Sequence, residues 1–392
     1  MRKVIGADPF VLFDKKSGYF YCYATSDVSE DNKAFYIYKT KDLVNYEFVN
    51  YALDLNTKNW AKDWYRAPEC YYNEKTGWYF LIYSARVKDE YLDKYFEDSE
   101  FEEGCKIGIA KSRSPEGPFI NICDKPIDFS PYDPEYLDIY KIVSNKMNPE
   151  ITYQEALTRA PKGVYLSCID ANLFFNDDKI YLYFSRCCYK NFTFDEKYNK
   201  FIEESNILGV ELERSFYDDP EANTNPSVSV KYKNIHGLNK DGFIKIINYH
   251  SDPQIWEDSH INDYDVYNGI KKNRRWSEGS TTFKKVIEGK EKYFILYSCN
   301  NFENKNYGVG LATSDDPLGI YKKYENNPII HQIENVLYST GHGDLVTLNG
   351  EDYYVFHARH TENERRSIYS CKLTIDNHGN PIVSDIIQGV LV

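Results

Sequence analysis

The stretch Ile180-Tyr181-Leu182-Tyr183-Phe184-Ser185-Arg186 is an aromatic-rich apolar run that ends in a hydroxyl residue and then a charged one. Aromatic and β-branched side chains favour the pleated, half-buried surface of a β-strand. The apolar run 172–175 and the polar residues Asn176-Asp177-Asp178 come directly before it. This segment therefore predicts two strands joined by a tight turn.

Similar runs recur along the chain, and each ends in small or hydroxyl residues followed by polar ones. They lie at residues 19–26, 78–86, 180–186, 293–300 and 353–359. About five repeated units is within the range of blade numbers of β-propellers. The repeat thus predicts an all-β fold in which each run forms one strand of a blade.

Neighbouring segments complete the predicted blades. The apolar run 345–348 is followed by Asn349-Gly350, a strong hairpin signal. Further strands that lead to Pro/Gly turns are found at 107–112 before 114–119 and at 309–314 before 316–321. Because no change of composition marks a linker, residues 1–392 are predicted to form a single five-bladed β-propeller domain.

The spacing between the repeats is uneven. The stretches 88–104, 130–162 and 248–275 are longer and more charged than the other connections. We expect them to be insertions on one rim of the propeller. Within the first, acidic and aromatic residues recur at helical spacing, which predicts a short helix in 88–103.

The composition restricts the partners of the protein. The formal net charge is -13, and such a surface repels phosphate backbones and anionic lipids, so neither nucleic acid nor membrane is expected to bind. Aromatic residues make up 16% of the chain, and their ring faces can stack on the apolar C–H faces of sugars. A neutral carbohydrate is the partner that this composition favours.

The nine cysteines show no C-x-x-C pair and no zinc-site spacing. Many lie inside apparent strands, where a free cysteine behaves as a small apolar side chain. No apolar segment follows Met1, and no apolar run is long enough to span a bilayer. These features predict a cytoplasmic protein, and a secreted protein whose signal segment was removed is the alternative.

Three short acidic segments carry the candidate chemistry: Gly6-Ala7-Asp8-Pro9, Ile169-Asp170-Ala171-Asn172 and Trp276-Ser277-Glu278-Gly279. Each is expected to come just before the innermost strand of a blade, and the starts of such strands converge on the central channel. An Asp beside Pro is commonly a turn residue. Three carboxylates at equivalent positions of repeated units instead indicate glycoside cleavage, which needs a carboxylate base and a protonated acid.

Several short motifs, in order along nearly the whole chain, resemble family 43 of the glycoside hydrolases. They are Asp8-Pro9, Arg66-Ala67-Pro68-Glu69, Ile169-Asp170, Glu278-Gly279, Ala312-Thr313-Ser314 with Pro317-Leu318-Gly319, Asn327-Pro328-Ile329 and Thr340-Gly341-His342-Gly343. The resemblance implies that Asp8 is the general base and Glu278 the general acid. It implies that Asp170 orients Glu278 and raises its pKa, because a nearby like charge disfavours ionisation.

The resemblance also implies contacts with the substrate. Arg366 matches a family arginine near the terminal sugar, although Arg365-Arg366 could also be a solvated turn. Trp64, Arg66 and Trp276 flank the motifs and are predicted to contact the substrate. This sequence has Arg66 where many members have Trp, and Ser280 where Pro often follows Glu-Gly. Both departures are at the rim of the active site, so the resemblance defines the type of reaction better than the identity of the substrate.

His342 lies between Gly341 and Gly343. In the resembled family the matching histidine lies in the channel and often binds a calcium ion together with waters. The resemblance therefore implies a Ca²⁺ ion on the propeller axis. A hydrogen-bonded core histidine is the alternative.

Taken together, the sequence and the resemblance predict an inverting exo-glycosidase that acts on plant-derived oligo- or polysaccharides. It would release terminal α-L-arabinofuranose, β-D-xylose or both, and of these two activities we favour arabinofuranosidase. The alternatives are an endo-acting arabinanase and a non-catalytic carbohydrate-binding propeller. The late Gly341-His342-Gly343 motif favours family 43 over the related fructan-cleaving propellers. The repeats lack the Gly-His and Trp-Asp signature of WD propellers.

Overall fold

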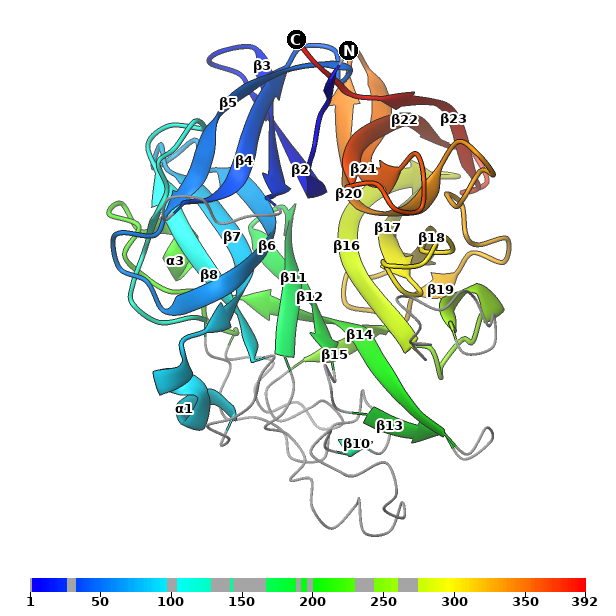
Figure 1. The fold of residues 1–392 in the computed structure, drawn as a ribbon, viewed down its shortest axis with the longest axis horizontal. Helices are drawn as coiled ribbons and strands as arrows, with labels where there is room; N and C mark the ends of the chain where they lie inside the picture. The colour runs from blue at the N-terminus through cyan, green and yellow to red at the C-terminus, as the bar shows by residue number, and fades with distance from the viewer. Residues whose placement is uncertain are drawn as a thin grey trace.

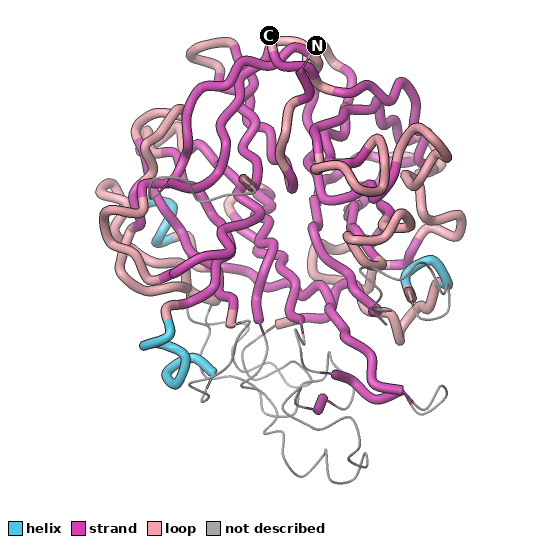
Figure 2. The backbone as a smooth tube through the Cα atoms, in the orientation of Figure 1, coloured by secondary structure: helices cyan, strands magenta, loops and turns pink. Residues whose placement is uncertain are grey.

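The computed structural model describes residues 2–26, 33–96, 104–127, 142–143, 167–187, 192–195, 200–229, 243–259 and 274–392. Its sheets are arranged as blades around a central axis, with the colours following the chain round the ring (Figure 1). Loops and turns lie mostly at the outer edges of the ring (Figure 2). The prediction of an all-β, five-bladed propeller is confirmed.

Each blade is an antiparallel sheet whose strands follow one another in sequence. The blades are β2 (Ala7–Asp14), β3 (Tyr19–Thr25), β4 (Lys33–Thr40) and β5 (Asn45–Asp54); β6 (Ala61–Tyr72), β7 (Tyr79–Val87), β8 (Cys105–Ser112) and β9 (Ile120–Asn121); β11 (Ser167–Asn176), β12 (Lys179–Cys187), β14 (Lys200–Leu212) and β15 (Ile244–Ile247); β16 (Arg274–Ile287), β17 (Lys290–Cys299), β18 (Gly308–Ser314) and β19 (Lys322–Lys323); and β20 (Tyr338–Leu348), β21 (Glu351–Arg359), β22 (Ser367–Ile375) and β23 (Pro381–Gln388).

The repeated aromatic runs form the second strand of every blade, namely β3, β7, β12, β17 and β21. The apolar runs before them belong to the first strands, which lie closest to the axis (Figure 1). The Asn349-Gly350 turn between β20 and β21 has φ values of 54° and 83°. Two positive φ values match the twist of a two-residue hairpin, which is why this dipeptide is favoured there.

The two ends of the chain close the ring. β1 (Arg2–Lys3) pairs antiparallel with β24 (Val390–Leu391), and β24 pairs parallel with β5 of the first blade. The backbone of Val4 accepts a hydrogen bond from the Ile368 amide of the last blade at 2.9 Å. Residues far apart in sequence thereby join the first and last blades (Figure 1).

The apolar core consists of layers between adjacent blades. Alternate residues of a second strand face opposite neighbours: Tyr21 and Tyr23 pack toward the second blade, whereas Phe20 and Cys22 pack toward the fifth. The other blades repeat this arrangement. Burial of each such aromatic side chain contributes about 1.5–3 kcal/mol, so the aromatic runs hold the ring together as well as forming strands.

One connection departs from the simple repeat. β14 is long enough to pair antiparallel with β12 and also parallel with β16 of the next blade, through Glu203–Ser205 and Arg274–Trp276. The first residues of β14, just before the stretch that pairs with β16, pair with β13 (Phe192–Asp195), which pairs with β10 (Ile142–Val143). The start of β16 is therefore fixed by the preceding blade.

The helix predicted within 88–103 is present, as η1 (Asp89–Tyr91) followed by α1 (Leu92–Phe96). Further helical turns are α3 (Ser215–Asp218) and η2 (Ile255–Glu257). The insertion predicted at 130–162 and much of that at 248–275 fall outside the described residues.

Eight cysteines lie in the described part of the chain, and all are free; Cys123 is partly exposed and the rest are buried. Among the described residues, no helix combines the length and the apolar character needed to cross a bilayer.

Candidate active site

A β-bulge recurs near the start of every innermost strand. The pairing with the second strand shifts there in all five blades, and one residue at each bulge has positive φ: Asp8 (50°), Ala67 (50°), Asp170 (56°), Gly279 (58°) and His342 (38°). The three predicted acids and His342 therefore lie within the first strands, not before them as the sequence suggested. A bulge re-aims side chains, and here it does so at the channel mouth.

Four of the five bulges are held by residues that end the aromatic runs of the preceding blades. The backbone N–H of Ala67 donates to Thr25 Oγ1 at 2.8 Å, that of Asp170 to Ser84 Oγ at 2.8 Å, and that of His342 to Ser298 Oγ at 2.6 Å. In the last blade His357 takes the hydroxyl's place, and its Nδ1 accepts the Asp8 N–H at 3.0 Å. The repeated hydroxyl in the sequence thus has a structural role.

Glu278 departs from the expected equivalence of the three acids. Asp8 and Asp170 occupy the positive-φ position of their bulges, whereas in β16 that position belongs to Gly279. Glu278 lies one residue earlier, at the place that Arg66 occupies in β6. The expectation of three equivalent positions was wrong for Glu278, because the side chain before a bulge can also face the channel.

One pocket brings all the predicted site residues together. It encloses about 240 Å³ and is lined by Asp8, Thr25, Ser26, Trp64, Tyr65, Arg66, Ile169, Asp170, Arg274, Trp276, Glu278, Phe302, His342 and Arg366. These residues come from the innermost strands and from the loops beside them. A pocket with a few convergent polar groups and perturbed carboxylates is the usual form of an active site.

Asp8 is a buried carboxylate that remains ionised. Its Oδ2 accepts the Thr25 hydroxyl at 2.7 Å, and Arg366 Nη1 lies 3.5 Å from its Oδ1. Burial alone would raise the pKa of Asp8, but the Arg366 guanidinium holds that pKa well below its usual value. Asp8 can therefore accept a proton from water at neutral pH.

Glu278 has the opposite character. Burial, and then the charge of Asp170, raise its pKa to about 7. Two donors contact the carboxyl group and act against this rise: Trp276 Nε1 at 2.6 Å from Oε2, and the Tyr307 hydroxyl at 2.7 Å from Oε1. A carboxyl group with this pKa can hold a proton near neutral pH and give it up to a leaving group.

Asp170 and His342 lie between these two carboxyl groups. Burial, and then the charge of Asp8, raise the pKa of Asp170 to about 7. His342 Nδ1 lies 3.4 Å from Asp8 Oδ1 and 3.7 Å from Asp170 Oδ2. Burial lowers the pKa of His342. The imidazole is therefore neutral where it lies beside the Asp8 and Asp170 carboxyl groups.

The surroundings of His342 do not form a protein-built calcium site. Calcium takes six to eight oxygen ligands, and in the part of the chain that the structure describes no three His, Cys, Asp or Glu side chains are grouped to hold a metal ion. The Asp8 and Asp170 carboxylates are suitable oxygen donors, but they are too few. The calcium ion stays a prediction, and no reaction step is assigned to it.

Arginine and aromatic side chains form the rim of the pocket. The Trp64 ring lies 5.1 Å from the Arg66 guanidinium and 4.3 Å from that of Arg86. The Arg86 Nε in turn donates to Asp63 at 2.6 Å. Trp64 also has a φ of 55°, and such strain in a bulky residue is typical of functional sites.

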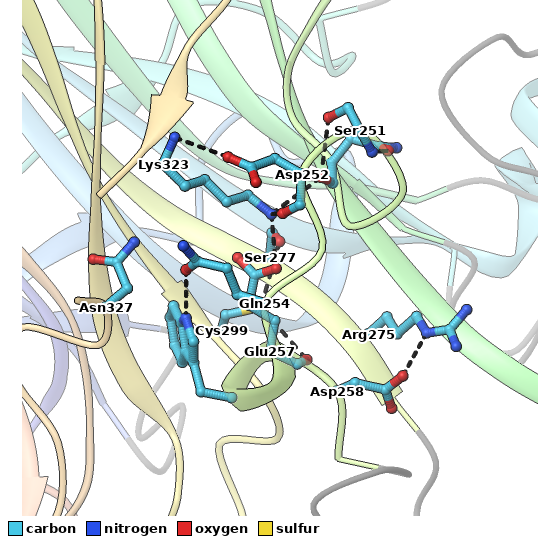
Figure 3. A network of polar contacts seen from close by, with 12 residues as sticks. Ser251, Asp252, Gln254, Glu257, Asp258, Arg275, Ser277, Cys299, Lys323 and Asn327 are labelled. Carbon is cyan, nitrogen blue, oxygen red and sulfur yellow. Dashed lines mark hydrogen bonds and ion pairs between the residues drawn. The ribbon is translucent and has the colours of Figure 1, made fainter. Parts of the chain in front are cut away.

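A buried polar network fixes the strand that carries Glu278. Arg275 Nε contacts Asp258 Oδ2 at 2.7 Å, and both side chains are almost fully buried (Figure 3). Nearby, Lys323 forms a second buried ion pair with Glu257 at 2.7 Å (Figure 3). Since a broken buried pair costs about 3–5 kcal/mol, the Arg275 pair holds the start of β16 firmly against the segment that ends at Ser259, and the Lys323 pair holds that segment against β19.

The family model for "Glycosyl hydrolases family 43" matches residues 3–141 and 230–379, most of the chain. The chain belongs to family 43 of the glycosyl hydrolases. The matched residues include two of the three acids, Asp8 and Glu278, and also His342 and Arg366. The suspected family is thereby confirmed, and with it a glycoside hydrolase as the class of enzyme.

Solved structures share the family 43 fold. An endo-1,4-β-xylanase from Bacteroides thetaiotaomicron VPI-5482 is 24% identical with a TM-score of 0.63, covering 100% of this chain and 98% of that one. A thermostable family-43 glycoside hydrolase has the same identity and TM-score over 98% and 93%. An α-L-arabinofuranosidase from Lactobacillus brevis is 15% identical with a TM-score of 0.57, over 97% and 94%.

Among curated proteins, the β-D-galactofuranosidase xynD of Aspergillus niger (strain ATCC MYA-4892 / CBS 513.88 / FGSC A1513) is 32% identical over 75 residues. The matched stretch spans 19% of this chain and 22% of that relative.

Sequence reasoning missed several residues of the site, among them Thr25, which donates to Asp8. Tyr307 and His357 contact the acid and the base, and Arg274 and Phe302 line the pocket. One signal was available for His357, which stands where the other repeats have Ser or Thr. Tyr307 lies in an irregular segment before β18, where no periodic pattern points to the axis.

Proposed function

We propose that this family 43 enzyme is an inverting exo-glycosidase that releases a terminal pentose, α-L-arabinofuranose or β-D-xylose, from plant-derived oligo- or polysaccharides. The pairing of a buried ionised Asp8 with a buried Glu278 of raised pKa in one pocket carries the proposal. Asp8 would take a proton from a water molecule, and Glu278 would protonate the leaving oxygen. Asp170 would orient Glu278 and support its protonation.

The size of the pocket supports exo action. Its volume of about 240 Å³ is below the range of about 300–1,000 Å³ that is usual for drug-sized ligands. A pocket of this size suits one terminal sugar better than the middle of a chain. The Arg366 guanidinium, beside Asp8, would contact that sugar, while Trp64, Arg66 and Trp276 would contact the sugar or the adjoining residue.

The relatives support a pentose substrate. The similar structures include a xylanase, arabinanases and an arabinofuranosidase by name. The short match to a β-D-galactofuranosidase concerns a hexose and does not bear on the choice of pentose. An endo-acting arabinanase is the second candidate, since one of the similar structures is named as an endo-arabinase.

A panel of nitrophenyl glycosides tests the proposal. We expect cleavage of the α-L-arabinofuranoside or the β-D-xyloside, and NMR of the first product should show the inverted anomer. Linear arabinan and xylan should release monosaccharide without an early loss of viscosity. A rapid loss of viscosity would favour endo action, a retained anomer would reject the inverting mechanism, and no cleavage of any substrate would favour a binding propeller.

A further inference from the structure

Tyr307 is a buried residue whose contacts link the two candidate catalytic carboxyl groups. It lies directly before β18 and is 1% exposed. Its hydroxyl lies 2.7 Å from Glu278 Oε1. On the other side of its ring is His357, stacked with the centroids 6.0 Å apart and the planes 12° from parallel. His357 Nδ1 accepts the backbone N–H of Asp8 at 3.0 Å.

The two partners of Glu278 differ in what they can do. An indole N–H can only donate, so Trp276 requires Glu278 Oε2 to accept in every protonation state. A phenol hydroxyl can donate or accept. Tyr307 can therefore accept from a proton carried on Oε1 and can donate to that oxygen once the proton has left.

The packing around Tyr307 holds its ring in one place. A Cβ atom added to Gly341 would lie 2.0 Å from the Tyr307 Cε1 atom, so only glycine leaves room for the ring. The Thr340 hydroxyl donates to the Tyr307 carbonyl oxygen at 3.1 Å. Gly341, the residue before His342, is therefore required for the position of the Tyr307 ring.

We propose that Tyr307 is a positioning residue of the reaction: its hydroxyl holds the Glu278 carboxyl group and stabilises the carboxylate left after proton transfer, while its ring, stacked on His357, fixes the acid relative to the base. This inference rests on the proposed roles of Glu278 and Asp8. In the step concerned, the glycosidic C–O bond breaks and the Glu278 proton passes to the leaving oxygen. A water oxygen forms the new bond to the sugar, and its proton passes to Asp8.

Other groups near Glu278 affect its ionisation too. Asp170 on β11 opposes it, and His342 on β20 favours it when charged. Arg274 lies over the Trp276 ring, and Asp8 and Arg366 lie elsewhere in the same pocket. Since Tyr307 donates to the ionised form, its removal should raise the pKa of Glu278 further. Activity that needs protonated Glu278 should then persist to higher pH.

The test is Tyr307→Phe, which removes one hydroxyl and keeps the ring. On an oligosaccharide with a poor leaving group, kcat should fall about ten- to a hundredfold, the usual range for losing a hydrogen bond to a charged group. An activated nitrophenyl glycoside should lose only a few-fold, because its leaving group needs little protonation. The alkaline limb of the pH profile should move upward by about one pH unit.

Tyr297→Phe is a matched control. Tyr297 is equally buried, lies in the same blade, and donates to the buried carboxylate of Glu257 at 2.8 Å. Glu257 belongs to the network with Lys323, outside the pocket (Figure 3). Tyr297→Phe should lower the melting temperature about as much as Tyr307→Phe but leave the pH profile and the leaving-group dependence unchanged.

If Tyr307→Phe does not fold, Gly341→Ala, which keeps the hydroxyl and displaces the ring, should give the same kinetic pattern.

Equal effects of the two Phe variants on the pH profile, or equal losses on both substrates, would overturn the proposal. A separate measurement keeps it distinct from the proposed function: the carboxyl C=O stretch of Glu278, assigned by comparison with Glu278→Gln, can be titrated without substrate. A higher pKa in Tyr307→Phe supports the positioning role even in a protein with no glycosidase activity. An unchanged pKa refutes it.

Discussion

Replacing Glu278 with glutamine tests the general acid most directly, because glutamine keeps the shape and removes the proton. The amide oxygen can still accept from Trp276 Nε1, and the amide N–H can donate to the Tyr307 oxygen. Both contacts are thereby retained in the variant. We expect Glu278→Gln to fold normally, so that changes in rate reflect chemistry.

The expected loss depends on the leaving group. General acid catalysis contributes about 10²–10⁴-fold, so cleavage of an arabino- or xylo-oligosaccharide should fall by that factor. A nitrophenyl glycoside should lose much less, because nitrophenolate leaves without full protonation. The ratio of the two losses is the diagnostic quantity, since a structural defect would reduce both rates alike.

Glu278→Gln should also change how stability depends on pH. The Glu278 carboxyl group has a pKa of about 7 instead of 4.5, which corresponds to about 3 kcal/mol. A group whose pKa is raised on folding stabilises the protein below its unfolded pKa and loses that contribution as the pH rises through the folded value. The free energy of unfolding of Glu278→Gln, relative to that of wild type, should therefore increase as the pH rises from 4.5 to 7. Above pH 7 this difference should stay constant.

Thermal melts of both proteins at pH 5 and pH 8 measure this effect. An unfolding entropy of about 2.1 cal/mol/K per residue over 392 residues converts about 3 kcal/mol into about 4 °C. The variant's melting temperature relative to wild type should rise by about that amount from pH 5 to pH 8. A difference that is independent of pH, or equal kinetic losses on both substrates, would refute the role of Glu278 as a buried acid.

Four further outcomes are expected. Asp8→Asn should lower activity about 10²–10⁴-fold on activated and unactivated substrates alike, with the melt retained; a collapsed melt would make Asp8 a turn residue. Asp170→Asn should move the alkaline limb of the pH profile to lower pH, because the charge of Asp170 helps to raise the pKa of Glu278; an unmoved limb would leave Asp170 with an orienting role alone. Gly279→Ala should lower stability and activity, since its Cβ would lie 2.5 Å from the His342 ring at a φ of 58°, a strain of about 1–3 kcal/mol; an unchanged melt would show that the bulge tolerates a side chain. EDTA should lower the melting temperature and activity if calcium is bound at His342, and added calcium should restore both; no change would leave His342 to contact the two carboxylates alone.

The repeated features of the fold could be predicted from the sequence because each repeat must satisfy the same local physics. The aromatic runs became the second strands, since alternate residues of a central strand pack against both neighbouring blades. In three of the blades the hydroxyl at the end of the run accepts the bulge N–H of the next blade, as Ser84 does for Asp170. Such features recur in several copies, so individually weak patterns reinforce one another.

The parts that were missed are those that occur once. Glu278 lies one residue before its bulge, and a single sequence offers no sign of this offset, because a bulge is set by backbone pairing and not by residue type. Tyr307 reaches the axis from an irregular segment, and its slot is made by Gly341 in another blade. Only the assembled ring brings a residue of the fourth blade against a glycine of the fifth.

The same geometry explains how one ring can give two carboxyl groups opposite proton affinities. Asp8 and Glu278 are both buried, so burial raises the pKa of each and cannot by itself distinguish them. The distinction comes from their nearest charges, because Asp8 lies beside the Arg366 guanidinium whereas Glu278 lies near Asp170. Since these neighbours come from different blades, any change that loosens the ring should bring the two pKa values together. A destabilised variant with its catalytic residues intact, such as Arg275→Met in the Asp258 pair, should therefore show a narrowed pH optimum before it loses its fold, and an unaltered optimum would show that the local contacts of each carboxyl group are sufficient.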